Sequence, residues 1–420
     1  MLPGDTTAPG PQAAGRKKML SVDEAQSMLL ARARPCAGVE IVPTERAVGR
    51  VLAESQDSRV DVPPADNSAM DGYAVAADDL APDGPTRMTV SQRIPAGAAG
   101  SPLLPGSAAR IFTGAPIPPG ADTVVIQENC EADGDQVLIR TPAQRGENVR
   151  RAGEAVRAGD SVLEAGTRLT PQHLGMAASV GIDRLPVFRP LRVAIFSTGN
   201  ELVMPGTPLG PGQIYNSNRY TLSALVQRLG MEVVDLGIIA DELEATRDVL
   251  RRASAQADAI ITSGGVSVGE EDYVKTALEE TGEMMMWKVA IKPGKPIAYG
   301  EVDGIPFLGL PGNPVSVFVT FCLLVKPFLL RRQGAHHEPP AALPAVADFE
   351  WSRSGPRREF LRVRVRRGGD GALHAELFPN QGSGVLTSVV WADGLAIAPE
   401  HTVVQPGDTV DYYPYAVLLD

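Results

Sequence analysis

The sequence predicts a multidomain protein of the α/β plus β class, with a central doubly wound, mostly parallel α/β domain. Between residues 191 and 335, short apolar runs of strand length alternate with stretches of helical periodicity. This pattern indicates a parallel sheet covered by helices on both faces. Residues 62–148 contain short apolar segments punctuated by Pro and Gly, and residues 341–420 contain alternating segments typical of half-buried antiparallel strands. At about 150 residues per domain, 420 residues allow roughly three domains.

The first part of the chain is predicted to contain a tail, the start of a helix and the first half of a discontinuous domain. Residues 1–19 are rich in Pro, Gly, Ala and Thr and lack the apolar core of a signal peptide, so we expect a disordered tail. Ser21 and Glu24 have the spacing of a capping box, which predicts a helix start. Residues 20–61 and 149–190 form one discontinuous first domain if the later segment rejoins this helix. The β-rich module, residues 62–148, is then an insertion.

The central domain carries acidic residues just past its predicted strands. The strands are predicted over residues 191–196, 232–239 and 258–262, with helices over 217–229 and 243–255. Glu201, Asp241 and Asp272 follow these runs. Because ligands of such sheets bind outside the carboxyl ends of the strands, the three carboxylates can converge. Carboxylate oxygens are the ligands that a hard cation prefers. Because two glycine-rich turns and two lysines also follow, we expect a site for a metal ion and a phosphorylated ligand.

A glycine-containing loop after the third strand can bring the backbone close to a ligand. Gly264 and Gly265 permit positive φ, and Ser263 and Ser267 add hydroxyl groups. The alternative for Asp272 is a structural role, in which its charge complements the dipole of the next helix.

Three lysines follow this loop. If residues 284–291 form one strand of period two, Lys288 and Lys292 share a face about 13 Å apart, at ~3.3 Å per residue. Lys292 and Lys295 flank Pro293 and Gly294 and are better placed to hold one anion. Solvated surface lysines are the alternative.

Pro311, Gly312 and Asn313 precede an apolar helix that begins near Pro314. Free backbone N–H groups at such an end bind phosphate well, although a simple capped helix is the alternative. The apolar stretch 315–325 is shorter than the ~20 residues of a membrane helix, so we expect a buried core helix.

Two further side chains lie in the β-rich module. Asp71 belongs to an Asp-Gly turn, and Thr113 precedes a glycine that leaves a backbone N–H open to an oxyanion. An ordinary loop and an ordinary strand end are the alternatives.

Composition excludes several classes of protein. The net charge of −11 argues against a nucleic-acid surface. Three scattered cysteines fit a reducing compartment and no structural zinc, so we expect a cytoplasmic protein without a membrane or nucleic-acid partner.

Eight motifs in this order closely resemble the molybdopterin molybdenumtransferase (MoeA) family, whose eukaryotic relative is the E domain of gephyrin. They lie at residues 67–74, 112–115, 197–201, 237–241, 263–273, 291–296, 310–316 and 382–384. The resemblance implies a molybdopterin-binding type of α/β domain over residues 191–335, an inserted β domain and a C-terminal β-barrel-like domain. It also implies insertion of molybdate into adenylylated molybdopterin, Mg²⁺-assisted release of AMP and a homodimer formed through the first domain. The molybdopterin adenylyltransferase is a candidate partner.

The resemblance also assigns roles to individual residues. The implied catalytic residues are Asp71, Thr113, Glu201, Lys288 and Lys292, and the implied metal ligands are Asp241, Asp272 and Glu201. Within the motifs, the implied substrate-binding residues are Ser197, Thr198, Gly199, Ser263, Gly264, Gly265, Ser267, Lys295, Pro311, Gly312 and Asn313. Arg358, Arg362 and Ser383 of the last domain are implied to belong to the same cleft.

This chain departs from the family at two positions. Ala155 and Asn200 stand where an aspartate is common in relatives. The alternatives for function are a molybdopterin adenylyltransferase, which residues 191–333 resemble, and a non-catalytic scaffold like gephyrin. The motifs at residues 67–74 and 382–384 argue against the first, and the intact acidic and lysine positions argue against the second.

Overall fold

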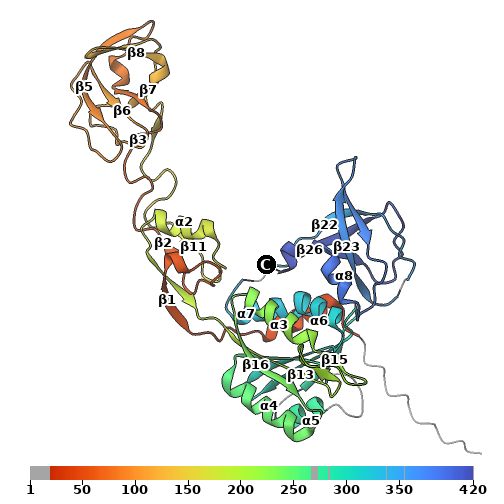
Figure 1. The fold of residues 1–420 in the computed structure, drawn as a ribbon. Helices are drawn as coiled ribbons and strands as arrows, with labels where there is room; N and C mark the ends of the chain where they lie inside the picture. The colour runs from red at the N-terminus through yellow and green to blue at the C-terminus, as the bar shows by residue number, and fades with distance from the viewer. Residues whose placement is uncertain (1–18, 266–272, 282–283, 337, 354, 420) are drawn as a thin grey trace, which may run out of the picture. The chain divides into compact units, whose positions relative to one another are not determined.

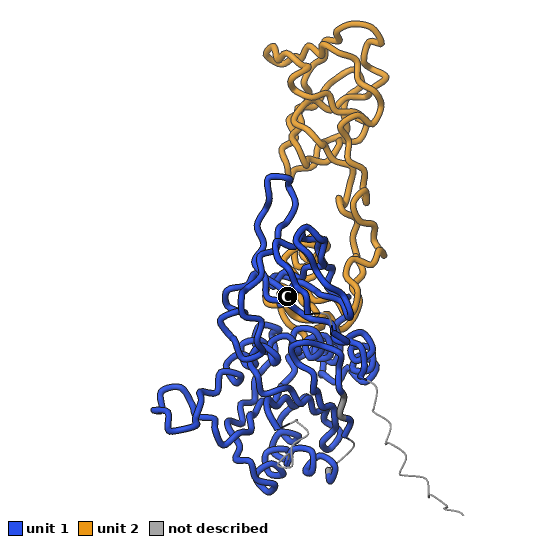
Figure 2. Tube along the Cα trace, turned by 90° about the vertical axis from the view of Figure 1, so that its right-hand side faces the viewer, with its two compact units in different colours: residues 1–39, 188–420 blue, residues 40–187 orange. Residues whose placement is uncertain are grey.

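A computed structural model describes residues 19–265, 273–281, 284–336, 338–353 and 355–419. The chain divides into two compact units. Unit 1 contains Met1–Val39 and Phe188–Asp420, and unit 2 contains Glu40–Val187 (Figure 2).

Unit 1 is built on a six-stranded sheet with the order β16-β13-β17-β21-β20-β18. Four neighbouring strands run parallel, and β20 and β18 are antiparallel to their neighbours. The strands are β13 (Arg192–Thr198), β16 (Glu232–Ile239), β17 (Ala259–Ser263), β18 (Met284–Lys288), β20 (Pro296–Val302) and β21 (Ile305–Leu310). Since β13, the first of these strands in sequence, lies between β16 and β17, the strand order reverses beside it, as a doubly wound sheet requires. The predicted fold class is confirmed.

Helices cover both faces of this sheet (Figure 1). Helices α4 (Leu243–Gln256) and α5 (Tyr273–Thr281) pack on one face through a core that includes Phe196 and Phe307. The other face is covered by α3 (Ser217–Arg228) and by a long helix formed by α6 (Pro314–Thr320), a π-helical turn (Phe321–Val325) and α7 (Lys326–Arg332). This long helix is long and apolar enough to cross a membrane, but 78 % of its most apolar segment is buried inside the structure. It is therefore the buried core helix predicted from residues 315–325.

Helix α1 (Val22–Arg32) begins with the predicted capping box. The Ser21 hydroxyl accepts the Glu24 N–H at 3.0 Å, and the Glu24 carboxylate accepts the Ser21 N–H at 2.7 Å. Val22, Ala25 and Leu29 pack into the same core as α7. The structure thus places this helix in unit 1, whereas the predicted first domain joined it to residues 149–190, which lie largely in unit 2.

A closed β-barrel follows in unit 1, in the region of the predicted C-terminal β domain. Its strands are β22 (Leu343–Ala347), β23 (Arg358–Arg367), β24 (Leu373–Leu377), β25 (Gly394–Ala398) and β26 (Thr409–Pro414). Strand β23 pairs with both β24 and β25, which closes the ring. The short helix α8 (Leu386–Trp391) lies between β24 and β25 in the sequence, and α9 (Tyr415–Leu419) follows β26.

The barrel also receives a strand from the middle of the chain. Strand β19 (Ile291–Lys292) pairs in parallel with the start of β23. A single strand over residues 284–291 is therefore wrong, because the chain leaves the α/β sheet after Lys288 and joins the barrel at Ile291. Lys288 and Lys292 belong to different sheets.

Unit 2 contains a six-stranded sheet in the order β7-β4-β6-β5-β9-β8 and a smaller layer. The sheet strands are β4 (Gly72–Val75), β5 (Thr86–Ile94), β6 (Ser107–Ile111), β7 (Thr123–Ile126), β8 (Cys130–Asp133) and β9 (Gln136–Ile139). The smaller layer has its own core, which includes Leu52 and Leu185. It combines the two-stranded pairs β1 (Val39–Pro43) with β12 (Arg184–Phe188) and β2 (Gln56–Asp57) with β11 (Ser161–Leu163), together with α2 (Pro171–Ser179). Strands β3 (Asn67–Ser68) and β10 (Val149–Arg150) pair where the chain enters and leaves the sheet region.

Candidate functional site

The carboxyl ends of β13, β16, β17 and β21 meet at one edge of the unit 1 sheet, because these strands are parallel and adjacent. Ser197 and Ser263 are paired in register across β13 and β17, and their buried hydroxyl oxygens lie 3.1 Å apart. The chain turns away from the sheet directly after these residues. Predicted site residues from four separate segments therefore share this edge.

The turn after β17 requires glycine at two consecutive positions. Gly264 and Gly265 have φ values of +90° and +65°. A Cβ on Gly264 would lie 2.8 Å from the Thr198 carbonyl oxygen, and one on Gly265 would lie 2.6 Å from Thr198 Oγ1. That hydroxyl is buried and has no hydrogen-bond partner among the residues that the structure describes. The turn therefore packs directly against the end of β13, as a close backbone approach requires.

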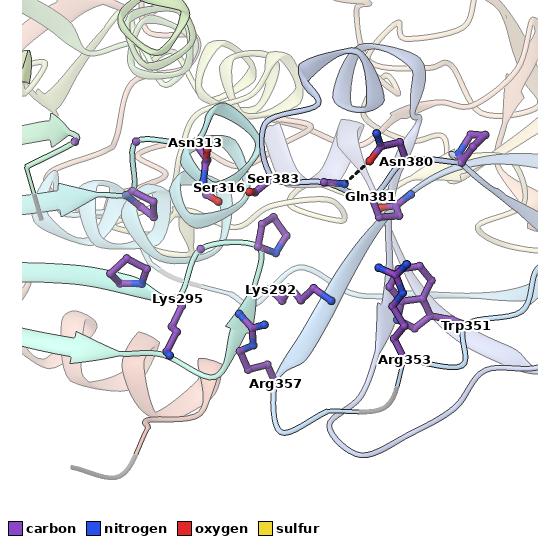
Figure 3. Close-up of a pocket in the computed structure, with 18 of the residues that line it drawn as sticks. Lys292, Lys295, Asn313, Ser316, Trp351, Arg353, Arg357, Asn380, Gln381 and Ser383 are labelled. Atoms are coloured by element: carbon purple, nitrogen blue, oxygen red, sulfur yellow. Dashed lines mark hydrogen bonds between the residues drawn. The ribbon is translucent and has the colours of Figure 1, made fainter. Parts of the chain in front are cut away.

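A cavity of about 770 Å³ opens beside this turn, between the sheet edge and the barrel (Figure 3). Four cationic side chains line it: Lys292, Lys295, Arg353 and Arg357. Within the described part of the chain, no acidic side chain belongs to its lining. A protein with a net charge of −11 thus concentrates positive charge here, which favours an anionic ligand.

Lys292 is held from two sides. Its ammonium nitrogen lies 2.9 Å from one Glu359 carboxylate oxygen and 3.0 Å from the other, and it sits 5.7 Å from the centre of the Trp351 ring. The Arg353 guanidinium lies 5.5 Å from the same ring. Arg357 has no hydrogen-bond or ion-pair partner among the described residues, so its guanidinium is available for a ligand anion.

The start of α6 forms another wall of the cavity. Asn313 occupies the N-cap position, but its side chain makes no capping hydrogen bond. The Val315 N–H donates to the Ser383 carbonyl oxygen at 3.0 Å, which fixes residues 382–384 against this helix end. Asn380 stabilises the same loop, because its side-chain oxygen accepts the Gly382 N–H at 3.0 Å (Figure 3). The alternative, a simple cap by the Asn313 side chain, is therefore absent, and the backbone of Ser383 contacts this helix end instead.

Eight of the predicted site residues line the cavity. They are Gly264, Gly265, Lys292 and Lys295, together with Pro311, Gly312, Asn313 and Ser383. Gly294, which also lines it, has φ +114°, and a Cβ there would lie 2.5 Å from the methyl group of Thr320. Ser197, Thr198, Gly199 and Ser263 lie at the adjoining strand ends and do not line the cavity.

Two of the three predicted acidic residues, Glu201 and Asp241, lie at the same edge of the sheet. The Asp241 N–H, just past β16, donates to the side-chain oxygen of Asn200 at 3.3 Å, and Asn200 directly precedes Glu201. Gly199 has φ +147°, and a Cβ there would lie 2.6 Å from the Glu201 carboxylate, which therefore folds back over the strand end. Asp272 and Ser267 lie outside the described residues.

Glu201 and Asp241 offer carboxylate oxygens, which are the ligands that Mg²⁺ prefers. Within the described ranges, no group of three or more His, Cys, Asp or Glu side chains is arranged to hold a metal ion. A complete protein cage is not what Mg²⁺ needs, because it usually takes one or two carboxylates, several waters and substrate phosphates. Glu201 and Asp241, at neighbouring strand ends, fit that smaller requirement.

Three other predicted residues lie elsewhere in unit 1. Lys288 is exposed at the end of β18 and is not part of the cavity lining. Arg358 forms ion pairs with Asp23 at 3.0 Å and Glu400 at 3.5 Å. Arg362 is 1 % exposed and donates to the Phe360 and Gly382 carbonyls and to the Ser388 hydroxyl, and burial lowers its pKa to about 10. Arg362 thus supports the loop that carries Ser383.

Sequence reasoning missed several cavity residues, notably Arg353, Arg357 and Trp351. The resemblance implied Arg358 for this cleft, but the cavity is lined by its neighbour Arg357. Which of two adjacent residues faces a ligand depends on the register of β23, and the sequence pattern alone did not determine it.

Asp71 and Thr113 lie together in unit 2. One oxygen of the Asp71 carboxylate accepts both the N–H and the hydroxyl of Thr113, each at 2.8 Å. These two hydrogen bonds lower the pKa of Asp71. The structure therefore brings the two predicted side chains into direct contact.

Comparison with known proteins accounts for nearly the whole chain. Residues 20–181 match the model of the MoeA N-terminal region (domain I and II), residues 194–331 that of a probable molybdopterin binding domain, and residues 344–415 that of the MoeA C-terminal region (domain IV). The chain belongs to the molybdopterin molybdenumtransferase (MoeA) family. It is accordingly a transferase of molybdenum cofactor biosynthesis.

Individual relatives agree with this membership. The Haemophilus influenzae protein named molybdopterin molybdenumtransferase is 39 % identical over 405 residues, covering 96 % of this chain and all of the relative. A Mycobacterium tuberculosis protein named molybdopterin molybdenumtransferase 2 is 43 % identical over 355 residues, covering 82 % of this chain and 87 % of the relative. The crystal structure of the MoeA protein from Pyrococcus horikoshii OT3 matches with a TM-score of 0.82 at 30 % identity, covering 94 % of this chain and all of that one.

Proposed function

We propose that this MoeA family member inserts molybdate into adenylylated molybdopterin and releases AMP with the help of Mg²⁺. The observation that carries the proposal is the cation-lined cavity at the carboxyl edge of the sheet, with Glu201 and Asp241 at neighbouring strand ends. Molybdate and the pyrophosphate of the pterin are both oxyanions. A site for both needs positive charge for the oxyanions and carboxylates for a hard cation, and this edge of unit 1 supplies each.

The cationic side chains would hold the oxyanions during the reaction. Arg357 and Lys295 have side chains without hydrogen-bond or ion-pair partners among the described residues, so they can bind a tetrahedral anion without losing a contact. Lys292 is oriented by Glu359 and Trp351 and adds a fixed positive charge. Charge fixed in advance in a partly enclosed cavity stabilises developing negative charge more than mobile charge in water does.

Glu201 and Asp241 would hold Mg²⁺, with Asn200 positioning the Asp241 backbone. When bound, the ion would supply positive charge to the pyrophosphate oxygens and to the departing phosphate of AMP. The Gly264–Gly265 turn would allow the pterin phosphate to approach the backbone at the end of β17.

A homodimer completes the proposal, with Asp71 and Thr113 reaching the cleft of a second copy. The exposed apolar side chains of β1 and its surroundings support self-association, since Val39, Ile41 and Val48 are 53 %, 61 % and 54 % exposed. Light scattering on the purified protein tests the dimer. A cytoplasmic location and transfer of the pterin from the adenylyltransferase belong to the same proposal.

The decisive assay is incubation with adenylylated molybdopterin, Mg²⁺ and molybdate, followed by measurement of AMP and of the molybdenum cofactor. We expect AMP release that depends on both molybdate and Mg²⁺. Consumption of ATP with release of pyrophosphate would instead indicate the adenylyltransferase reaction. No AMP release from intact protein and substrate would favour a scaffold.

One substitution tests the metal assignment. Asp241→Asn should abolish AMP release while pterin binding survives, because the change removes a metal ligand and leaves the cavity intact. Asp248→Asn, on the exposed side of α4 and paired with Arg251, is the matched control and should behave as the wild type. Full turnover by Asp241→Asn would contradict the assignment of this carboxylate as a metal ligand.

A further inference from the structure

One side chain in the cavity wall of unit 1, Gln381, is fully engaged with the protein itself. Its side-chain oxygen accepts the Arg362 N–H at 2.9 Å, and its side-chain nitrogen donates to the Arg362 and Phe378 carbonyl oxygens at 3.0 Å and 2.9 Å. A glutamine amide has two N–H donors, and both are used here. Gln381 lines the cavity but keeps no donor for an anion, so its role there is to hold other groups in place.

These hydrogen bonds continue the pairing of β23 with β24 beyond the end of the ladder. The two strands pair as far as Leu377 of β24, and the Phe378 N–H still donates to the Arg362 carbonyl at 3.1 Å. The next residue, Pro379, has no N–H to donate, and the chain leaves the sheet. The side chain of Gln381 then takes the place of a backbone partner opposite the Arg362 N–H. The segment after β24 therefore stays tied to β23.

The segment held in this way carries Ser383 (Figure 3). The Asn380 side-chain oxygen accepts the Gly382 N–H at 3.0 Å, and the Arg362 guanidinium donates to the Gly382 carbonyl at 3.4 Å. At the far end of the segment, the Ser383 carbonyl oxygen accepts the Val315 N–H at the start of α6. The backbone of the segment is thus fixed to the barrel on one side and to α6 on the other.

The hydroxyl group of Ser383 remains available in the cavity. Ser383 lines the cavity, and its hydroxyl has no hydrogen-bond partner among the residues that the structure describes. A serine hydroxyl lies one bond beyond Cβ, so the backbone determines where this donor can reach. Because O–H···O bonds need oxygen–oxygen distances of about 2.5–3.0 Å, a small displacement of the backbone weakens the hydrogen bond to a bound oxyanion.

We propose that Gln381 is a positioning residue for molybdate that acts through Ser383. Its three hydrogen bonds hold the backbone that places the Ser383 hydroxyl against the oxyanion. The inference rests on the proposed function for the identity of the oxyanion. Gln381 does not bind the anion itself, because both of its donors are used within the barrel. A change at Gln381 should therefore alter molybdate binding only while the Ser383 hydroxyl is present.

The test is a double-mutant cycle of Gln381→Met and Ser383→Ala in the full-length protein. Molybdate affinity is measured by isothermal titration calorimetry, and the molybdate KM and kcat of AMP release are measured in parallel. Methionine has nearly the length of glutamine and no charge, but it makes none of the three hydrogen bonds. Gln381→Met should weaken molybdate binding and raise its KM by roughly tenfold, which corresponds to one hydrogen bond to a charged group.

A general loss of folded protein would lower kcat and leave the KM unchanged, so the rise in KM separates positioning from stability. Gln405→Met is the matched control, because Gln405 is exposed in the same barrel, and its molybdate affinity should equal that of the wild type. Gln381→Asn, one methylene shorter and unable to span the same three bonds, provides the same test if the methionine variant does not fold.

In the Ser383→Ala background, Gln381→Met should change molybdate affinity by less than twofold, because the donor that Gln381 positions is already absent. A tenfold loss in that background would overturn the proposal, and so would an affinity of Gln381→Met within twofold of the wild type or no molybdate binding by the wild type. The outcome is separable from that of the proposed function. The expected binding results without AMP release by the wild type would keep the positioning role and remove the reaction, whereas AMP release with an unchanged molybdate KM in Gln381→Met would do the reverse.

Discussion

The ion pair between Lys292 and Glu359 allows the stability and the ligand-binding roles of one lysine to be separated. Lys292→Met removes the ammonium that contacts both Glu359 oxygens and the Trp351 ring. Glu359 is then left as an unpaired carboxylate with a side chain only 8 % exposed, whereas the Lys292 side chain is 31 % exposed. The substitution therefore removes a positive charge from the cavity and also leaves the buried Glu359 carboxylate without its partner.

The expected loss of stability lies between two limits. Exposed ion pairs contribute about 0–1 kcal/mol, and removal of one partner of a fully buried pair costs about 3–5 kcal/mol. Because solvent reaches the lysine end of this pair, we expect a cost of about 2 kcal/mol. At about 2–4 °C per kcal/mol for a domain of this size, the transition of unit 1 should move down by about 4–8 °C.

The assay combines thermal unfolding with molybdate-dependent AMP release for Lys292→Met, Glu359→Gln and the double variant. The double variant has no unpaired buried charge. Its melting temperature should therefore recover at least half of the decrease seen in Lys292→Met, while AMP release stays low. Lys275→Met, on the exposed surface of α5, controls for loss of any lysine. An unchanged melting temperature in Lys292→Met would refute the stability argument, and recovery of AMP release in the double variant would refute the ligand-binding role.

Three further predictions, one of them with a control variant, concern other parts of the structure. Gly265→Ala should lower both the melting temperature and molybdate affinity, because its φ is +65° and the new Cβ would lie 2.6 Å from Thr198 Oγ1. Gly304→Ala has similar strain at φ +78° but open space, so calorimetry should show a smaller loss, and equal losses would contradict the role of the contact. His374 donates to Asp348 and Asp370, and these hydrogen bonds raise the pKa of His374 above 6.5. The contribution of these ion pairs to folding stability is therefore complete below pH 6.5 and is lost as the pH rises through the pKa of the folded state. Melting temperatures of the wild type and His374→Gln should converge over that rise, and a constant difference would count against the ion pairs. Arg362→Lys should destabilise the barrel by about 1–3 kcal/mol in urea unfolding, since an ammonium cannot reach Phe360, Gly382 and Ser388 together.

Sequence periodicity predicted the α/β domain well because its elements are local. Helices α3 and α4 end within one residue of the predicted bounds, 217–229 and 243–255, and their apolar faces alone determine where they pack. The glycine turn after β17 was predicted for the same reason, because consecutive glycines indicate a backbone that other residues cannot adopt.

The prediction failed where a partner strand, and not the local pattern, decides the outcome. Ile291 and Lys292 read as the end of a longer strand, yet they pair with Arg358 and Glu359, more than sixty residues further along the chain. The same pairing sets the register of β23 and turns Arg358 toward Asp23 while Arg357 lines the cavity. Long-range pairing of this kind leaves no periodic signal in either segment.

Asn200 places a neutral side chain beside the acidic residues of this edge. The side-chain oxygen of Asn200 accepts the Asp241 N–H, a role for which an amide serves as well as a carboxylate. The amide of Asn200 therefore makes the hydrogen bond that positions Asp241 without adding a negative charge beside Glu201. Fewer negative charges at a cation site lower the affinity for the cation. Fewer negative charges close to the cavity also reduce the electrostatic repulsion of an oxyanion. A neutral side chain at position 200 therefore favours an anion at this edge, beside a cavity whose described lining is entirely neutral or cationic.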